Sequence, residues 1–226
     1  MTALVTVGGY RVVEATLRMP YQGAWVADLV SDEAPTTIAG AVSLVAPGAT
    51  LAGFVVPGRA GAYTVGLTYR TSLRVVGGAG GLSAPGTPKS YRAIAPAALL
   101  TALCSAAGER ASSTVSLASS ALPAWMRSSE SAGAALDALT LELAADAWRV
   151  LDDGSIWLGS DTWSASALDA ADPPATQLEI DSGVGWALYA VDAWSVRPGQ
   201  TVGGARVSAV EHRMDTRGLR TEVRYA

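Results

Sequence analysis

The stretch that closes the chain, residues 196–226, most constrains the fold. An Arg-Pro-Gly turn at 197–199 precedes two strand-like runs, 205–212 and 219–225, which are joined by a short polar connection. In the second run, charged residues at the even positions alternate strictly with uncharged residues at the odd positions. This period of two is typical of an antiparallel strand with one buried face. A terminal hairpin of this kind predicts a sheet that was begun earlier in the chain.

The first third of the chain also predicts short strands separated by Gly and Pro. Six strands at intervals of about ten residues favour a small barrel or sandwich, and a closed barrel removes exposed sheet edges. The expected strands are 4–7, 13–19, 25–30, 41–45, 51–56 and 63–76.

The middle of the chain changes period after two turn-rich segments at 77–81 and 85–88. Pro96 in a first turn and Gly108 after the last turn predict a helix over 97–107. A Leu stripe predicts a second helix over about 132–147, capped by one of the serines in 128–131.

A hairpin and a second group of strands complete the prediction. Runs 148–151 and 155–158 flank Asp-Asp-Gly at 152–154, a strong hairpin signal. Residues 162–174 are rich in Ala, Asp and Pro and indicate a linker, and 177–180 and 184–191 read as strands before the closing hairpin. The predicted fold is α+β and mainly β, with two small tube-type antiparallel β-barrels and an α/β insertion. The predicted domains are 1–88 for the first barrel, 89–165 for the insertion and 166–226 for the second barrel.

Composition excludes several classes of protein. The chain has 226 residues, a net charge of −4 and 16 basic residues, of which only Lys89 is a lysine. Without a basic run, a DNA-binding module is not expected. The single cysteine, Cys104, excludes an internal disulfide and a Cys-rich metal site, and its apolar surroundings predict a small buried side chain. No export signal or membrane-spanning stretch is recognised, so we expect a soluble protein that stays in the cytoplasm until it assembles.

Two motifs of the sequence share features with nucleotide-binding and catalytic sites. The glycine-rich stretch 77–81 lacks the Lys-Ser/Thr of a phosphate loop, so it predicts a turn or hinge. His212 is the only histidine, with Glu211 and Asp215 nearby and Ser208 expected on the same strand face. Four strand residues place Ser208 about 13 Å away, too far for proton transfer. We therefore interpret His212 as a polar residue at a strand end or subunit contact.

Carboxylates and tryptophans leave two further hypotheses open. Asp152 and Asp153 lie in the predicted hairpin turn, and Asp169 and Asp172 lie in the Ala/Asp/Pro-rich loop, so a carboxylate hydrolase stays possible. The tryptophans of the second half suggest either a sugar-binding surface or, in our preferred interpretation, core and interface packing. No catalytic, cofactor-binding or metal-binding residue is assigned, and no cofactor is expected. The tryptophans concerned are Trp125, Trp148, Trp157, Trp163, Trp186 and Trp194.

Several phrases, taken in order, resemble tail hub (baseplate hub) proteins of tailed bacteriophages and the related hub part of contractile injection systems such as the type VI spike protein. The resemblance covers nearly the whole chain. The phrases are WVADLV at 25–30, GAVSL at 40–44, LDAL at 136–139, WRV at 148–150, DGSIWLG at 153–159 and PGQTVGGARVSAVEH at 198–212.

The resemblance implies a structural virion protein of the tail tip or baseplate, without enzymatic activity and without membrane insertion. It implies a homotrimer that forms a pseudo-sixfold ring of six similar barrels, assembled in the host cytoplasm. Such a ring joins the hexameric tail tube, or distal tail protein, to a threefold spike or tip protein. Its channel passes DNA and the tape-measure protein. The chain lacks the spike domain and the lysozyme-like segment of larger relatives, so we expect the spike to be a separate polypeptide. The alternatives are a carbohydrate-binding β module and a carboxylate-dependent cell-wall hydrolase.

Overall fold

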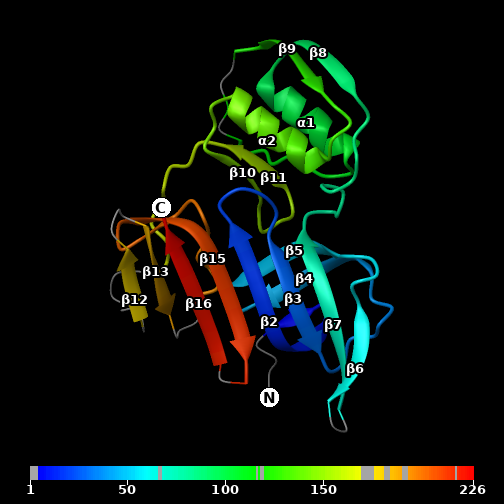
Figure 1. Ribbon diagram of the computed structural model, residues 1–226, viewed down its shortest axis with the longest axis vertical. Helices are drawn as coiled ribbons and strands as arrows, with labels where there is room; N and C mark the ends of the chain where they lie inside the picture. Colours follow the sequence, from blue (N-terminus) through cyan, green and yellow to red (C-terminus); the bar gives the residue numbers. More distant parts are fainter. Residues whose placement is uncertain are drawn as a thin grey trace.

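The protein, described here by a computed structural model, consists of one large sheet with a smaller α/β part at one end (Figure 1). The structure describes residues 5–65, 68–115, 117, 120–168, 176–180, 184–189, 193–216 and 218–226. The sheet contains 12 strands, and two separate pairs of strands lie in the α/β part. The fold is therefore α+β and mainly β, as predicted.

The elements follow in chain order. They are β1 (Thr6–Val7), β2 (Tyr10–Pro20), β3 (Val26–Ser31), β4 (Gly40–Ala46), β5 (Ala49–Val55), β6 (Gly61–Val65), β7 (Thr68–Gly77), β8 (Lys89–Ile94), α1 (Pro96–Ala106), β9 (Leu122–Arg127), α2 (Ala132–Glu142), β10 (Ala147–Val150), β11 (Ile156–Gly159), β12 (Thr176–Ile180), β13 (Val184–Tyr189), β14 (Thr201–Val202), β15 (Ala205–Asp215) and β16 (Gly218–Tyr225).

The first half of the sheet forms a ring of strands in the order β1-β4-β5-β7-β3-β2. The two-residue strand β1 completes it, because β1 pairs with both β2 and β4. The ring is thus not closed as a regular barrel, since only two residues bridge its ends.

The second half continues the same sheet in the order β15-β16-β13-β12, with β14 paired to β15. Strand β2 pairs antiparallel with β15, and this seam joins the two halves. Among the described residues the second half does not close into a ring. The prediction of two separate barrels is corrected in this respect, because backbone hydrogen bonds across the seam merge both groups of strands into one sheet.

The two halves contain a repeated unit. Residues 6–19 and 201–214 share TVGG-x-RV-x5-RM, which is the same residue at eight of 14 positions (Thr, Val, Gly, Gly, Arg, Val, Arg and Met). Both copies form a two-residue strand, a Gly-Gly turn with positive φ at both residues and an 11-residue strand with the same pattern of buried positions. Such turns match the twist of hairpins and require residues that tolerate positive φ. Both long strands carry a bulge at the same point of the repeat.

A local twofold axis relates the two copies. In the β2–β15 seam, Leu17 lies opposite His212, the residue equivalent to it in the repeat. Positions at equal distances on either side also pair, as residue 15 does with 214 and residue 19 does with 210. The axis therefore passes between Leu17 and His212. Neighbouring strands extend the equivalence, because β3, β7 and β6 correspond to β16, β13 and β12.

The two halves differ in the segment that packs beside the repeated strands. In the first half, the β4–β5 hairpin pairs with β1 and with β7. The second half has no counterpart of this hairpin among its described strands. Residues 193–200 instead place the fully buried Trp194 and Val196 in the core, and Thr201 bridges to Ala165.

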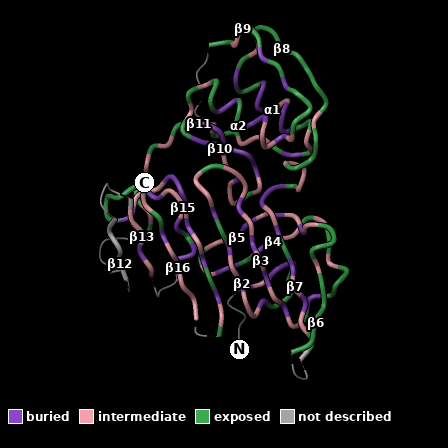
Figure 2. The backbone as a smooth tube through the Cα atoms, viewed as in Figure 1, coloured by how far each residue is buried: buried purple, intermediate pink, exposed green. Residues whose placement is uncertain are grey.

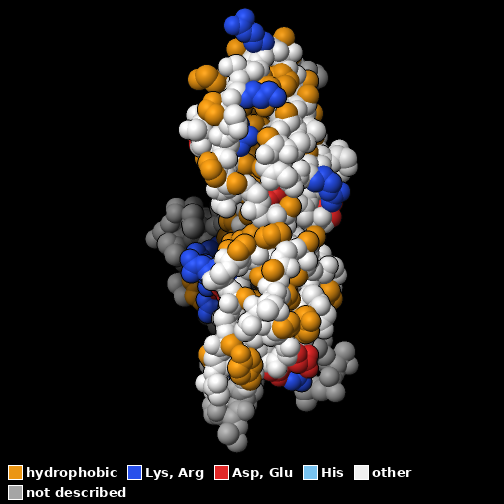
Figure 3. All heavy atoms as spheres, turned by 90° about the vertical axis from the view of Figure 1, so that its right-hand side faces the viewer, with side chains coloured by type: hydrophobic (Ala, Val, Ile, Leu, Met, Phe, Trp, Pro, Cys, Tyr) orange, Lys and Arg blue, Asp and Glu red, His pale blue; other side chains and the backbone are white. Residues whose placement is uncertain are grey.

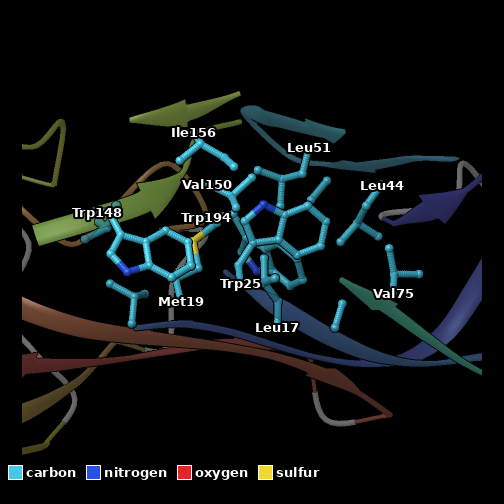
Figure 4. Close-up of a cluster of buried hydrophobic side chains, with 14 of the residues drawn as sticks. Leu17, Met19, Trp25, Leu44, Leu51, Val75, Trp148, Val150, Ile156 and Trp194 are labelled. Atoms are coloured by element: carbon cyan, nitrogen blue, oxygen red, sulfur yellow. The ribbon is translucent and has the colours of Figure 1, made fainter. Parts of the chain in front are cut away.

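A common core connects both halves with the α/β part. Figure 4 shows Trp148, Val150 and Ile156 of the β10–β11 hairpin directed toward Trp25 of the first half and Trp194 of the second. Hydrogen bonds fix the hairpin in place, since Gly23 N donates to Trp148 O and Ala52 N donates to Asp152 O. The buried segments in Figure 2 run from the sheet into this hairpin.

Several predicted elements are confirmed. The helix expected over 97–107 is α1, and the serine cap of α2 is Ser131, whose side chain accepts from Ala134 N. The hairpins predicted at 148–158 and 205–225 are β10–β11 and β15–β16. The strand pair β8–β9 was not predicted.

Two predicted elements are wrong in extent. The single strand expected over 63–76 is the hairpin β6–β7, and a glycine at position 66 of the sequence stands between the two strands. The helix expected to reach residue 147 ends at Glu142, because Ala144 has a positive φ of 48° that a helix does not accommodate.

Candidate functional site

The most elaborate group of side chains lies where the two halves and the β10–β11 hairpin meet. Arg149 lies 4.3 Å over the ring of Trp157 and 5.5 Å over Tyr21. Tyr21 stacks on Trp163 at 5.6 Å, and Arg206 of β15 lies 4.8 Å over Trp163. These five residues form one continuous stack in the order Trp157, Arg149, Tyr21, Trp163 and Arg206, which we call the junction stack. It links the β2–β3 loop, the hairpin, the segment after it and β15.

An ion pair fixes the position of Arg149 in the junction stack. Arg149 pairs with Asp161, and both side chains are almost fully buried. Gly199 packs against this pair, because a Cβ on it would lie 2.5 Å from Asp161 Oδ1. Burial raises the pKa of Tyr21, and its hydrogen bond to Asp161 raises it further. Trp163 has a positive φ of 52°, a strained backbone that the surrounding contacts hold in place.

A cavity of about 380 Å³ opens beside the junction stack. Arg149, Asp152, Trp157, Asp161 and Arg197 are among the residues that line it. Arg197 pairs with Asp152 through two hydrogen bonds of 2.7 and 2.8 Å, so both carboxylates in the wall are neutralised by arginines. The wall therefore carries little net charge and holds its polar groups in fixed pairs.

Gly77 ends strand β7, and the rest of the glycine-rich stretch 77–81 bends the chain, in keeping with the predicted turn or hinge. Amides of this bend hold a carboxylate of the same chain. The buried Glu109 accepts from Ala79 N at 2.7 Å and from Gly81 N at 2.8 Å. A Cβ at Gly78 would lie 2.6 Å from Glu109 Oε2. The loop resembles an anion-binding nest in its chemistry, and an internal carboxylate already occupies it.

His212 is buried in the core of the second half, and not at a strand end. Its Nδ1 lies 2.9 Å from Thr221 Oγ1, and its ring stacks on Trp194 at 5.0 Å. Burial lowers the pKa of His212 to about 3, and the positive charge of Arg197 contributes. A proton acceptor with so low a pKa and no access to solvent is unsuited to general base catalysis near neutral pH.

The neighbours weighed with His212 have other partners. The prediction that Ser208 shares its strand face is wrong, because the bulge between 207 and 209 shifts the alternation of β15. Ser208 Oγ donates to Arg224 O. Glu211 accepts from Arg18 Nε at 2.9 Å, and Asp215 pairs with Arg220.

The two aspartates of the β10–β11 turn, Asp152 and Asp153, serve as partners of arginines and of a turn serine. Asp153 caps the β10–β11 turn by accepting from Ser155 N and Oγ and also pairs with Arg110, and these hydrogen bonds hold its pKa below the usual value. A catalytic acid of a glycosidase needs a raised pKa. Asp169 and Asp172 lie outside the described residues.

The tryptophans are mainly core residues. Trp125, Trp148, Trp157 and Trp194 are buried, which confirms the preferred interpretation for these four. Trp163 is half-buried: its ring stacks on the ring of Tyr21, and the guanidinium of Arg206 lies over it. Cys104 is buried as predicted, and burial raises the pKa of its thiol to about 12.

The face of the sheet that points away from the core, which we call the outer face, carries a network of ion pairs that crosses the β2–β15 seam. Arg74 donates two hydrogen bonds to Asp28, and Arg18 bridges Asp28 of β3 and Glu211 of β15. A hollow lined by these strands follows the same face. This face is polar in both halves because alternate residues of its strands point away from the core.

Sequence reasoning missed the residues that build the junction. Arg149, Asp161 and Arg197 belong to no catalytic or binding motif in the sequence, and their pairing depends on tertiary structure. The repeat TVGG-x-RV-x5-RM was a usable signal for the seam.

No group of three or more His, Cys, Asp or Glu side chains in the described part of the chain could hold a metal ion. Neither α1 nor α2, the helices of that part, is long and apolar enough to cross a membrane.

Comparisons with known proteins identify structural relatives. No protein-family model and no curated protein matches the chain. A tail protein from Neisseria meningitidis MC58 matches with a TM-score of 0.77 and 12% identity over 98% of this chain and 94% of that one. The 43 kDa tail protein of prophage MuSo2 from Shewanella oneidensis matches with a TM-score of 0.74 and 9% identity over 98% of this chain and 96% of that one.

A third structure comes from a secretion system. An E. coli component of the type VI secretion system, itself similar to the bacteriophage T4 tail proteins gp27 and gp5, matches with a TM-score of 0.73 and 14% identity, over 97% of this chain and 75% of that one. Across nearly its whole length, the chain thus has the fold of these tail and secretion-system proteins.

Proposed function

We propose that this protein is a structural tail hub of a bacteriophage or phage-like particle. Three copies form a ring that joins the tail tube to a spike or tip, and DNA and a tape-measure protein pass through the channel. The protein acts in the tail of the virion after assembly in the host cytoplasm, and it has no enzymatic role. Three units fit this role: 1–88, 89–165 and 166–226.

The observation that carries the proposal is the match of the whole fold to two tail proteins and a tail-like secretion component, with more than 90% of both tail proteins covered. The repeated unit adds independent support. Two similar units in one chain give three copies six units, the number that a hexameric tube requires.

The outer face of the sheet supports a channel that DNA passes without binding. Arg18 and Arg74 on this face are paired with carboxylates, so phosphates would have to displace these ion pairs to bind there. We place this face toward the channel.

The alternatives receive less support. A sugar-binding surface needs exposed aromatic faces, whereas Trp194 is buried and Trp163 belongs to the junction stack. A carboxylate hydrolase needs an acid with a raised pKa, and the pKa of Asp153 is lowered.

The test is the mass of the purified chain by light scattering over a dilution series, followed by electron microscopy. A chain of 23.0 kDa predicts a trimer of 3 × 23.0 = 69 kDa and a ring with a central opening. Rings should also bind the tail-tube protein of the same particle. Specific affinity for glycans, or DNA binding that persists at physiological salt, would contradict the proposal.

A further inference from the structure

Arg127, the last residue of β9, is buried without a counter-charge. Only 3% of its surface is exposed, and its Nε has no hydrogen-bond partner. Among the described residues, no carboxylate or other acceptor binds its guanidinium. Most arginines of this protein do pair with a carboxylate, as the almost fully buried Arg149 does with Asp161. An unpaired buried charge is unfavourable because nothing replaces its lost hydration. Arg127 therefore requires an acceptor that the described part of the chain does not supply.

The guanidinium of Arg127 lies against the segment that leads into β8. A Cβ at Gly86 would lie 2.1 Å from Nη2 and 2.3 Å from Nε, so the backbone of this segment covers one side of the group. Gly86 N donates to Glu130 O at 2.9 Å, which places the contact just before the first turn of α2. Nε is sealed from solvent and the two Nη atoms are not, so only the tip of the guanidinium reaches the surface. The opening suits a narrow acceptor that approaches the tip directly.

A second cation lies directly across the strand pair. Lys89 of β8 is in register with Arg127, so both side chains lie on the same face of the β8–β9 pair. Lys89 Nζ lies 5.1 Å from the centre of the Tyr91 ring and has no ion-pair partner among the described residues. Like charges at opposed positions destabilise a strand pair. An anion bound by both cations would remove this repulsion.

The surroundings of this pair contain few negative charges. Residues 82–129 include four basic residues and one acidic residue, Glu109, which the amides of the glycine-rich bend already hold. The first turn of α2 contains no acidic residue, and the N-terminus of a helix carries partial positive charge. Figure 3 shows Lys and Arg side chains over this upper end of the molecule. The end is thus locally positive in a chain whose net charge is −4.

We propose that Arg127 and Lys89 form a binding site for a carboxylate, and that an acidic segment of a partner protein supplies it. The planar fork of a guanidinium matches the two oxygens of a carboxylate. A Glu or Asp side chain, or a chain terminus, is narrow enough to reach the tip of Arg127, whereas the phosphates of a membrane surface or a duplex are presented on broad surfaces. The site goes beyond the hub function and does not depend on it.

The test measures binding of a fluorescently labelled hexaglutamate peptide to the full chain by anisotropy at low salt. Arg127→Met removes the charge and keeps most of the side-chain length, and it should weaken binding by about tenfold or more. Arg92→Met is the matched control, because it removes one exposed cation from the opposite face of the same strand pair. Its affinity should stay within about twofold of the wild type. Lys89→Met should give an intermediate loss, and a hexaglutamine peptide should not bind.

Urea unfolding separates a binding site from a structural role of Arg127. Without peptide, Arg127→Met should unfold at the wild-type urea concentration or above it, because the variant removes a buried charge that has no partner. Saturating peptide should raise the unfolding midpoint of the wild type and leave that of Arg127→Met unchanged. A lower midpoint for the variant without peptide would mean that the chain already satisfies the guanidinium, and it would overturn the site.

Two further outcomes would also overturn the carboxylate site. One is a wild type that does not bind the peptide, or that loses equal affinity in Arg127→Met and Arg92→Met. The other is binding of phosphatidylglycerol vesicles or duplex DNA that requires Arg127, without binding of the peptide, which would assign the cations to phosphate. A trimer in light scattering would leave the hub function standing in each case, so the two proposals fail separately.

Discussion

The interiors of the two halves of the sheet are filled by different kinds of segment. The first half fills its ring with the β4–β5 hairpin, whose backbone groups are paired along the strands. The second half fills the corresponding space with the loop 193–200, which buries Trp194. A loop leaves backbone carbonyls without ladder partners, so the second half needs polar side chains in its interior.

Arg197 supplies those hydrogen bonds. Its Nη1 donates to the carbonyl oxygens of Trp194 and Val196, and its charge is balanced by Asp152 of the β10–β11 turn. The α/β part is thereby tied to the second half through the loop that fills it.

The repeat shows the same difference at single positions. The pair Leu17 and Ala27 of the first half corresponds to His212 and Thr221 of the second, and all four are fully buried. The apolar pair lies in the first half, where the β4–β5 hairpin completes the ring. The hydrogen-bonded polar pair lies in the second half, next to the loop 193–200. One repeated unit can therefore be packed against strands in one half and against a loop in the other. The half that packs against the loop contains buried polar groups.

The largest expected effect comes from removing the residue that fills the second half. Trp194→Ala should lower the free energy of unfolding by about 3–5 kcal/mol, because a buried Trp leaves a large cavity. Urea unfolding followed by circular dichroism measures it. Exposed Met126→Ala serves as the control, with a change of about 0.5 kcal/mol or less. A small effect of Trp194→Ala would mean that the loop is not what holds the second half together.

The next effect concerns Arg197. Arg197→Ala should cost about 2–3 kcal/mol, since two buried carbonyls and Asp152 lose their charged donor. The same denaturation experiment applies. Arg110→Ala, which removes the exposed pair with Asp153, should cost well under 1 kcal/mol and provides the comparison. Equal effects of the two variants would contradict the role assigned to Arg197.

A pH-dependent difference should follow from His212. Its folded pKa of about 3 lies below the unfolded value, so protonation favours the unfolded state, and stability is lost as pH falls below about 6.5. Between pH 7 and 5 this group alone should remove about 2 kcal/mol. The variant His212→Leu with Thr221→Ala gives the second half the apolar pair of the first. Its unfolding free energy should fall about 2 kcal/mol less over the same range, and an identical pH profile would refute the assignment.

The smallest effect is expected at the seam. Arg18→Gln removes ion pairs to Asp28 and Glu211 on an exposed face, so its cost should stay within about 1 kcal/mol and shrink at high salt. The backbone ladder between β2 and β15 should hold the halves together without it. Thermal melts at low and high salt measure this. A loss of several kcal/mol would show that charges, and not the ladder, join the halves.

Much of the fold was predictable from local pattern. Alternation in the closing run and Gly-rich turns gave most of the strands, and Pro96 with Gly108 bounded a helix correctly. The hairpin at 63–76 was missed because both arms are rich in strand formers, so propensity alone did not reveal that the run forms two strands.

The sequence by itself determined most of the strands, the helix that begins at Pro96 and the hairpins at 148–158 and 205–225, because these depend on residues near one another in the chain. Tertiary structure alone decided that the halves share one sheet, that Glu109 occupies the glycine-rich turn and that His212 is buried. Each of those depends on contacts between segments that are distant in sequence, and no local preference encodes which distant partner a strand edge or a charge will meet.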